Sequence, residues 1–209
     1  MTQHMAGTVR LEAQRNVIHF CGPINPITVH SIKGTMLQAL NSHKSNPAIA
    51  PVSDFYFVFC SEGGDVNSGI SLFNFLRAVP VPLIMHNFGC VDSIAILVYM
   101  AADTRYVTDN GRFFFHGFTS TFIQPIAAFS SHDFSIAERS CSVMNHMETY
   151  RKCIVERIDN SKSVIDFEAA FREGCVVGSS EAIANGIAHK IVSPDNFISE
   201  NDVHLGVTP

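Results

Sequence analysis

The sequence predicts an α/β fold with a mainly parallel sheet, and three observations lead to this prediction. Two runs, residues 54–60 and 81–89, are too uniformly apolar for half-exposed strands, so each is expected to be buried on both faces. Each run is followed by a predicted helix, 66–79 and 93–102. The chain has 209 residues, of which 46% are hydrophobic, which is enough for one sizeable core. Strands that alternate with helices form a parallel sheet with right-handed crossovers.

The other elements of the N-terminal half follow the same alternation. Residues 16–24 form a β-branched and aromatic run that ends in Gly-Pro, as expected of a strand. Residues 28–43 begin at a threonine suited to an N-cap and carry an apolar stripe, which predicts a helix. Residues 104–118 have the pattern of two short strands around an Asp-Asn-Gly turn.

Beyond residue 118 the pattern changes to longer helices. A stretch rich in serine and threonine comes first, up to Ser131. The elements expected after it are a long polar helix, two shorter helices and a strand, at about 133–158, 163–173, 179–186 and 187–193. The tail after Pro194 is polar, and we expect it to be loose.

Charge and cysteine usage narrow the function classes. The formal net charge is −5, whereas proteins that hold nucleic acid concentrate Lys and Arg on one face, so nucleic acid is not an expected partner. The six cysteines are scattered, without a CxxC pair or zinc-type spacing, which predicts reduced thiols and no metal site. The N-terminus lacks a signal-type apolar stretch, and no segment has the length of a membrane span. We therefore expect a cytoplasmic protein with no membrane partner.

Two glycine-containing turns lie where a parallel sheet usually binds its ligand. Residues 61–65 (Ser-Glu-Gly-Gly-Asp) follow one buried strand, and residues 89–93 (Gly-Cys-Val-Asp-Ser) follow the next. Ligands of open sheets bind beyond the carboxyl ends of the strands, and glycine allows backbone N–H groups to point at a ligand. The two turns are therefore either an oxyanion hole or the ordinary strand-to-helix connections that need glycine in any α/β protein.

Ser93 and His116 are the candidates for nucleophile and general base. Taken singly, a serine at a helix start is usually an N-cap, and a histidine enclosed by apolar sequence is usually a satisfied buried side chain. Taken as a pair, they suit nucleophilic catalysis, because an imidazole accepts the serine proton and later passes it to the leaving group.

Four segments resemble the proteolytic subunit of the Clp protease. FVFCSEGGDVNSGISLFNFL is similar to that family's Ser-Pro-Gly-Gly-x-Val turn, and GCVDSIAILVYMAAD is similar to its Gly-x-x-x-Ser nucleophile turn. RFFFHGF resembles its strand ending in the catalytic histidine, and SSEAIANGIAHKIV resembles its C-terminal Ser-x-x-Glu-Ala block. The likeness runs from about Asn16 to Ser193, and the four blocks occur in the family's order on matching elements.

The resemblance implies a serine peptidase with the Clp/crotonase-type fold, a spiral of ββα units with a protruding handle helix. Carried over by position, it makes Ser93 the nucleophile, His116 the general base, and the backbone amides of Gly64 and Ile94 the oxyanion hole. It implies peptide or unfolded-protein substrates and a ring-shaped homo-oligomer. Any ATP dependence requires a separate ATPase unfoldase, because this chain has no Walker sequence. No metal or organic cofactor is implied.

The same resemblance divides a single domain, residues 1–209, into a head, a handle and a tail. These parts are expected at about 16–118 and 160–193 for the head, 119–159 for the handle and 194–209 for the tail. The apolar stretch at 122–126, next to the long helix, is expected to be buried by a neighbouring subunit.

The chain departs from the family at the third member of the catalytic triad. The position of the family's aspartate falls on Ala170. Asp166 and Glu173 lie one helical turn before and after it, so either is a candidate for a relocated acid, although each is also consistent with a solvated surface charge. A Ser-His dyad is the next possibility.

Two other functions stay open. FCSEGGDV is also similar to the oxyanion segment of the crotonase group, which shares the fold and binds acyl-CoA thioesters, but the glycine-rich triplet of that group is replaced by Val91-Asp92-Ser93. An alanine at position 170, where the resemblance places the triad aspartate, also fits a catalytically inactive scaffold subunit of the same fold.

Overall fold

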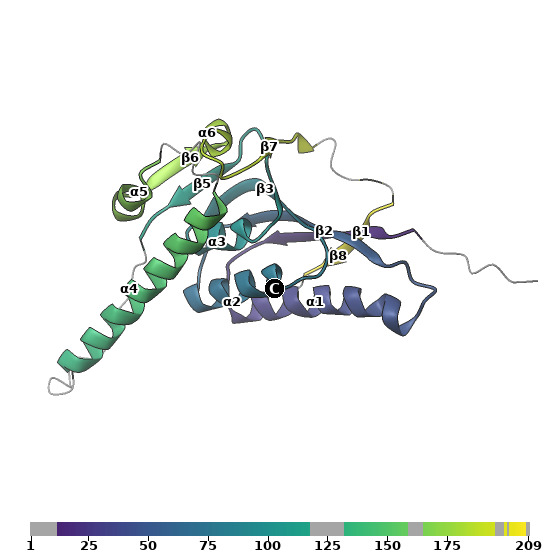
Figure 1. Ribbon diagram of the computed structural model, residues 1–209, viewed down its shortest axis with the longest axis horizontal. Helices are drawn as coiled ribbons and strands as arrows, with labels where there is room; N and C mark the ends of the chain where they lie inside the picture. The colour runs from purple at the N-terminus through teal and green to yellow at the C-terminus, as the bar shows by residue number, and fades with distance from the viewer. Residues whose placement is uncertain (1–11, 118–131, 159–164, 195–198, 200, 208–209) are drawn as a thin grey trace, which may run out of the picture.

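A computed structural model describes residues 12–117, 132–158, 165–194, 199 and 201–207. Its elements in chain order are β1 (Gln14–Cys21), α1 (Pro26–Ser45), β2 (Val52–Ser61), α2 (Val66–Arg77), β3 (Leu83–Asp92), α3 (Ile94–Met100), β4 (Thr104–Val107), β5 (Arg112–Phe115), α4 (His132–Arg157), α5 (Phe167–Glu173), β6 (Cys175–Gly178), α6 (Ser179–Ala184), β7 (Lys190–Ile191) and β8 (Val203–Gly206) (Figure 1).

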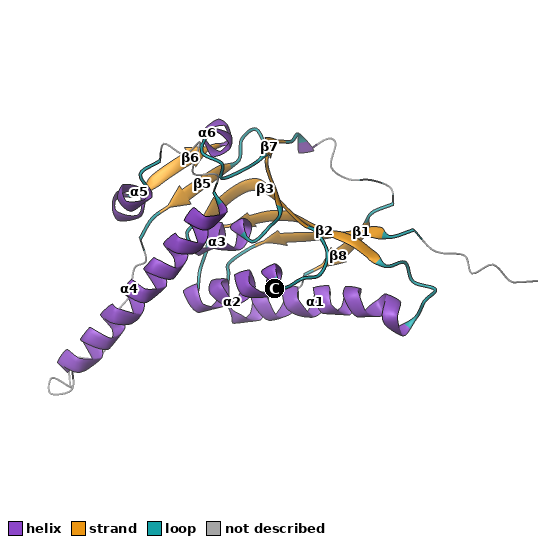
Figure 2. Cartoon of the chain, in the orientation of Figure 1, coloured by secondary structure: helices purple, strands orange, loops and turns teal. Residues whose placement is uncertain are grey.

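The strands form one mixed sheet that is mainly parallel, as predicted. Its order is β6-β5-β3-β2-β1-β8, and β4 pairs with both β3 and β7. Among the described strands, β5 and β6 form the one antiparallel pair. Helices α1 and α2 lie side by side along one face of the sheet, while α4 projects away from the body of the molecule (Figure 2). The α/β prediction is therefore confirmed.

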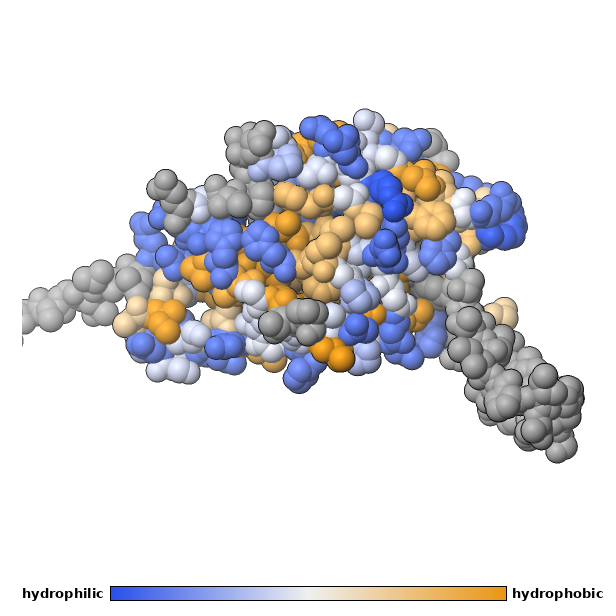
Figure 3. Space-filling view, turned by 180° about the vertical axis from the view of Figure 1, so that it is seen from behind, coloured by the Kyte–Doolittle hydropathy of each residue, from blue (hydrophilic) through white to orange (hydrophobic). Residues whose placement is uncertain are grey.

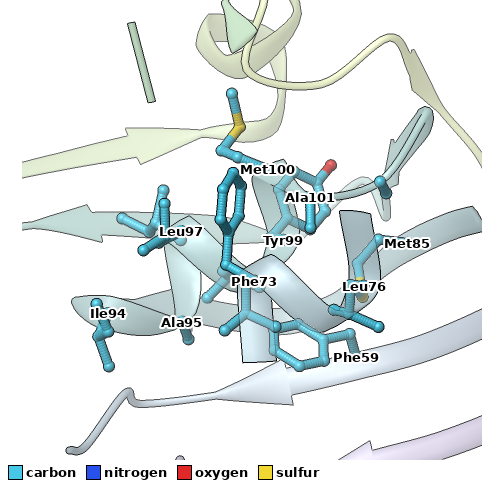
Figure 4. Packing of buried hydrophobic residues seen from close by; sticks show 14 of the residues in the cluster. Phe59, Phe73, Leu76, Met85, Ile94, Ala95, Leu97, Tyr99, Met100 and Ala101 are labelled. Carbon is cyan, nitrogen blue, oxygen red and sulfur yellow. The ribbon is translucent and has the colours of Figure 1, made fainter. Parts of the chain in front are cut away.

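The core lies between this sheet and its helices. Every side chain of α3 is buried, and Figure 4 shows several of them packed against Phe73 and Leu76 of α2 and Phe59 of β2. Burying a large apolar side chain contributes about 1.5–3 kcal/mol. A fully buried α3 fixes the position of the residue before it, Ser93.

Five sequence-based expectations differ from the structure. The strand expected at 187–193 is limited to β7. Helix α1 begins at Pro26, because the side chain of Asn25 accepts from the N–H groups of Ile27 and Thr28 and so caps the helix earlier than Thr28. The two short strands at 104–118 do not pair with each other, since β4 and β5 each run parallel to β3. The helix expected from 163 is described from Phe167. The tail expected to be loose contains β8, which pairs with β1.

Surface and thiol features complete the description. No helix in the described ranges has the length and apolar character needed to cross a membrane. Five cysteines whose side chains are described are free thiols. Seen from behind, the molecule carries a band of apolar surface between polar margins (Figure 3). The apolar stretch at 122–126 lies outside the described residues.

Candidate active site

Three neighbouring strands bring the candidate residues to one edge of the sheet. β2, β3 and β5 are adjacent and parallel, so their carboxyl ends coincide. Val91 of β3 is the register partner of Ser61 on one side and of Phe113 on the other. Gly63 and Ser93 each follow two residues later and therefore lie side by side, and His116 comes directly after β5.

Ser93 has a strained backbone and a hydroxyl that does not cap the helix. Its angles are φ 56° and ψ −133°, and it is the one non-glycine residue with a positive φ in the described part of the chain. Such a conformation costs about 1–3 kcal/mol. The backbone N–H of Ser93 donates to the carbonyl of Phe114 on β5 at 2.9 Å, but its side chain makes no capping hydrogen bond to α3. The sharp strand-to-helix turn resembles a nucleophile elbow, in which the serine oxygen stands free of the helix.

The glycine pair lies directly against this turn. A Cβ on Gly63 would come within 2.7 Å of the Cβ of Ser93, so only glycine fits there. The Gly63 carbonyl accepts from the N–H of Ile24 at 2.8 Å. Because the peptide is trans, the N–H of Gly64 points the opposite way, away from Ile24. The N–H of Gly64 is therefore directed to the side of the turn opposite Ile24.

The peptide between Ser93 and Ile94 is held by a buried tyrosine. The Tyr150 hydroxyl, on α4, donates to the Ser93 carbonyl at 2.8 Å, and the Ile96 N–H donates to the same oxygen at 3.0 Å. Tyr150 has no exposed surface. Since the carbonyl is fixed from this side, the N–H of Ile94 points in the opposite direction.

His116 is oriented by a backbone carbonyl. Its Nδ1 lies 2.7 Å from the carbonyl oxygen of Gly117, and its ring is 5.1 Å from that of Phe114. Within the described residues no hydrogen bond joins His116 to the Ser93 side chain, although both residues stand at the same edge of the sheet.

The acidic candidates have other partners. Asp166 Oδ1 accepts from the N–H of Ala169 at the start of α5. Glu173 pairs with Arg172 at 3.0 Å on the surface, where its side chain is 67% exposed. Ala170 is buried on α5. The sequence brought these three residues together on one helix, but neither carboxylate hydrogen-bonds to His116.

Asp92, which precedes the candidate nucleophile, is engaged by an arginine on the neighbouring strand. It forms an ion pair with Arg112 at 3.0 Å. Burial raises the pKa of the Asp92 carboxyl, and the neighbouring Arg112 opposes this effect. Its role is to join β3 to β5.

The family model described as Clp protease matches residues 8–195. The chain belongs to the Clp protease family. It is 29% identical over 174 residues to the ATP-dependent Clp protease proteolytic subunit 2 of Pseudomonas aeruginosa, an alignment that covers 75% of this chain and 73% of that one. A solved structure of a ClpP1 mutant from Listeria monocytogenes superposes with a TM-score of 0.64 at 19% identity, covering 85% of this chain and 91% of the other. The Clp/crotonase-type fold is thus confirmed, and the chain is a ClpP-like proteolytic subunit.

Sequence reasoning missed two parts of this candidate site. Nothing in a polar helix marks Tyr150 as a partner of a serine 57 residues away. The Gly117 carbonyl has no side-chain signature at all. Gly63 belongs to the glycine turn that the sequence indicates, yet its close approach to Ser93 appears only in three dimensions. Among the residues with described side chains, no group of three or more His, Cys, Asp or Glu forms a metal site.

Proposed function

We propose that this ClpP-like subunit is a serine endopeptidase that uses Ser93 as nucleophile, His116 as general base, and the N–H groups of Gly64 and Ile94 as oxyanion donors. The observation that carries the proposal is the strained turn at Ser93. A non-glycine residue with φ 56° is retained at the end of a buried strand while its hydroxyl serves no capping role. Strain of this kind is concentrated at functional sites.

The reaction follows from these groups. Ser93 Oγ attacks the carbonyl carbon of the peptide bond, and its proton passes to Nε2 of His116. The developing oxyanion accepts hydrogen bonds from Gly64 and Ile94, and one such donor is worth about 3–4 kcal/mol in other enzymes. The imidazolium then protonates the leaving amine. Water, activated by the same histidine, hydrolyses the acyl-serine ester and restores the hydroxyl.

The proposed function also includes an assembly, a class of substrate and a partner protein. We propose a homo-oligomeric ring as the working assembly, supported by the projecting α4 and by the apolar band of Figure 3. Peptides or unfolded proteins are the proposed substrates, with a separate ATPase as the unfolding partner. A cytoplasmic location stays a prediction.

Peptide cleavage by purified variants tests the proposal. Ser93→Ala is expected to lose at least about three orders of magnitude in kcat, whereas Ser71→Ala, on the exposed surface of α2, is expected to match the wild type. Equal activity of Ser93→Ala and wild type would refute the assignment. Tight binding of an acyl-CoA without peptide cleavage would favour the crotonase alternative, and the absence of both would favour an inactive scaffold.

A further inference from the structure

We propose that the backbone carbonyl of Gly117 replaces the missing triad carboxylate and holds His116 in the tautomer that a general base needs. The inference rests on the proposed function, because it assigns a positioning group to the same site. The resemblance to the family places its acid position on Ala170, whose side chain cannot accept a hydrogen bond.

The chemistry of the 2.7 Å contact fixes the proton. A carbonyl oxygen can only accept, so Nδ1 of His116 must be the donor in its hydrogen bond with Gly117. In a neutral imidazole one nitrogen is protonated and the other is an acceptor. Nε2 therefore carries the lone pair that takes the serine proton. In serine triads the carboxylate produces the same tautomer by accepting from Nδ1.

Gly117 lies directly against α5. A Cβ on Gly117 would lie 2.9 Å from the backbone oxygen of Phe171, so this glycine allows the helix to approach closely. Phe171 is itself buried, with its ring 5.9 Å from that of Phe115 and 5.1 Å from that of Tyr150. The helix that carries Ala170 thus lies directly against Gly117.

The two acidic neighbours are engaged elsewhere. Asp166 precedes α5 and accepts from the Ala169 N–H, while Glu173 pairs with Arg172. A backbone acceptor needs no side chain from this helix, which explains how Ala170 is tolerated.

The replacement is incomplete in one respect. A carbonyl sets the tautomer, but it lacks the negative charge that stabilises the imidazolium formed during proton transfer. We therefore expect low turnover in the wild type. Ala170→Asp, which places a carboxylate on the helix beside Gly117, is expected to raise kcat by about tenfold or more, whereas Ala169→Asp, one residue away, is expected to leave it unchanged.

Nitrogen NMR of the full-length protein with 15N-labelled histidine tests the tautomer without reference to activity. At a pH of about 9, where imidazoles are neutral, His116 is expected to show a protonated Nδ1 and an unprotonated Nε2. His189 is an internal reference of opposite type, because its Nδ1 accepts from the backbone N–H of Arg105 at 3.1 Å. The resonances are assigned by their loss in His116→Gln and His189→Gln. A protonated Nε2 on His116 would overturn the proposal.

Variants separate the carbonyl from the acids. Asp166→Ala and Glu173→Ala are expected to leave the His116 tautomer unchanged, and a switch of tautomer in either variant would overturn the proposal in favour of a relocated acid. Gly117→Ala, whose Cβ would clash with the backbone oxygen of Phe171 and so displace the backbone of residue 117, is expected to populate the other tautomer. Failure of the proposed function is recognised by a separate result. Peptide cleavage that persists in Ser93→Ala would refute the nucleophile, whereas the tautomer of His116 is measured independently of cleavage.

Discussion

Ser93 occupies a backbone conformation that glycine adopts far more readily than serine. Relief of strain at φ 56° favours glycine by about 1–3 kcal/mol, and the greater freedom of glycine in the unfolded chain removes about 0.5–1 kcal/mol of this. We expect Ser93→Gly to be more stable than Ser93→Ala by about 1 kcal/mol in urea denaturation, while both lack peptidase activity. Equal stability of the two variants would show that the turn is not strained.

Tyr150 is expected to act on the rate through the Ser93 peptide. Tyr150→Phe removes the hydrogen bond to the Ser93 carbonyl, so the Ile94 N–H is held less firmly and kcat falls by about tenfold with KM unchanged. Tyr99→Phe is the matched control, because that buried hydroxyl donates to Tyr106 at 2.9 Å, away from the site. Both variants should lose about 1 kcal/mol of stability. Equal kcat in the two variants would assign Tyr150 a purely structural role.

At the scale of elements, β3 carries a buried histidine that ties stability to pH. Burial lowers the pKa of His86 to about 4, and its Nδ1 lies 2.6 Å from the Tyr56 hydroxyl. An unfolded histidine titrates near 6.5, so the unfolded state binds the proton first as the pH falls. The free energy of unfolding is expected to drop by about 2 kcal/mol between about pH 7.5 and about pH 5 from this group.

His86→Asn, which keeps a polar partner for Tyr56 but does not titrate, isolates this contribution. Over the same pH range, the free energy of unfolding of this variant is expected to fall by about 2 kcal/mol less than that of the wild type. Urea denaturation at fixed protein concentration measures both proteins. His30→Asn, at an exposed position of α1, is the control and should follow the wild type. An identical pH dependence of all three proteins would contradict the account.

The elements that local patterns determine are the ones the sequence predicted. Buried strands such as β2 are apolar over most of their length, and the range predicted for α4 agrees with its described ends to within one residue. Pairing between distant segments is a different matter. The strand β8 lies in a polar tail and exists through its ladder with β1, which no local pattern encodes. The turn before β5 has a hairpin signature, but both flanking strands pair with β3 instead.

The candidate site likewise contains residues that local sequence indicates and contacts that it does not. The sequence indicates Ser93, His116 and the glycine turn because each of them lies at or just after the end of a predicted strand and is marked by its residue type. The supports of these groups are backbone atoms and a distant hydroxyl, as the Gly117 carbonyl and Tyr150 show, and such contacts leave no trace in residue spacing.

At the scale of the whole molecule, association through α4 is expected. Met144 on this helix is 71% exposed, so its side chain is available for contact with a neighbouring subunit. Light scattering at micromolar concentration is expected to show a ring-sized assembly for the wild type and smaller species for Met144→Lys. Thr149→Lys, which adds the same charge at an exposed position of α4, is the control and should assemble normally. A monomeric wild type would contradict the proposed ring.

The central claim is that Ser93 is an activated nucleophile, and covalent labelling with a fluorophosphonate tests it most directly. Located by peptide mass spectrometry, the label is expected on Ser93 alone, at one per chain, and its rate is expected to fall sharply in His116→Gln because the base is then missing. Ser93→Ala should take up no label, and Ser71→Ala should be labelled as the wild type is. A wild-type protein that stays unlabelled, or that carries the label on another residue, would contradict the account.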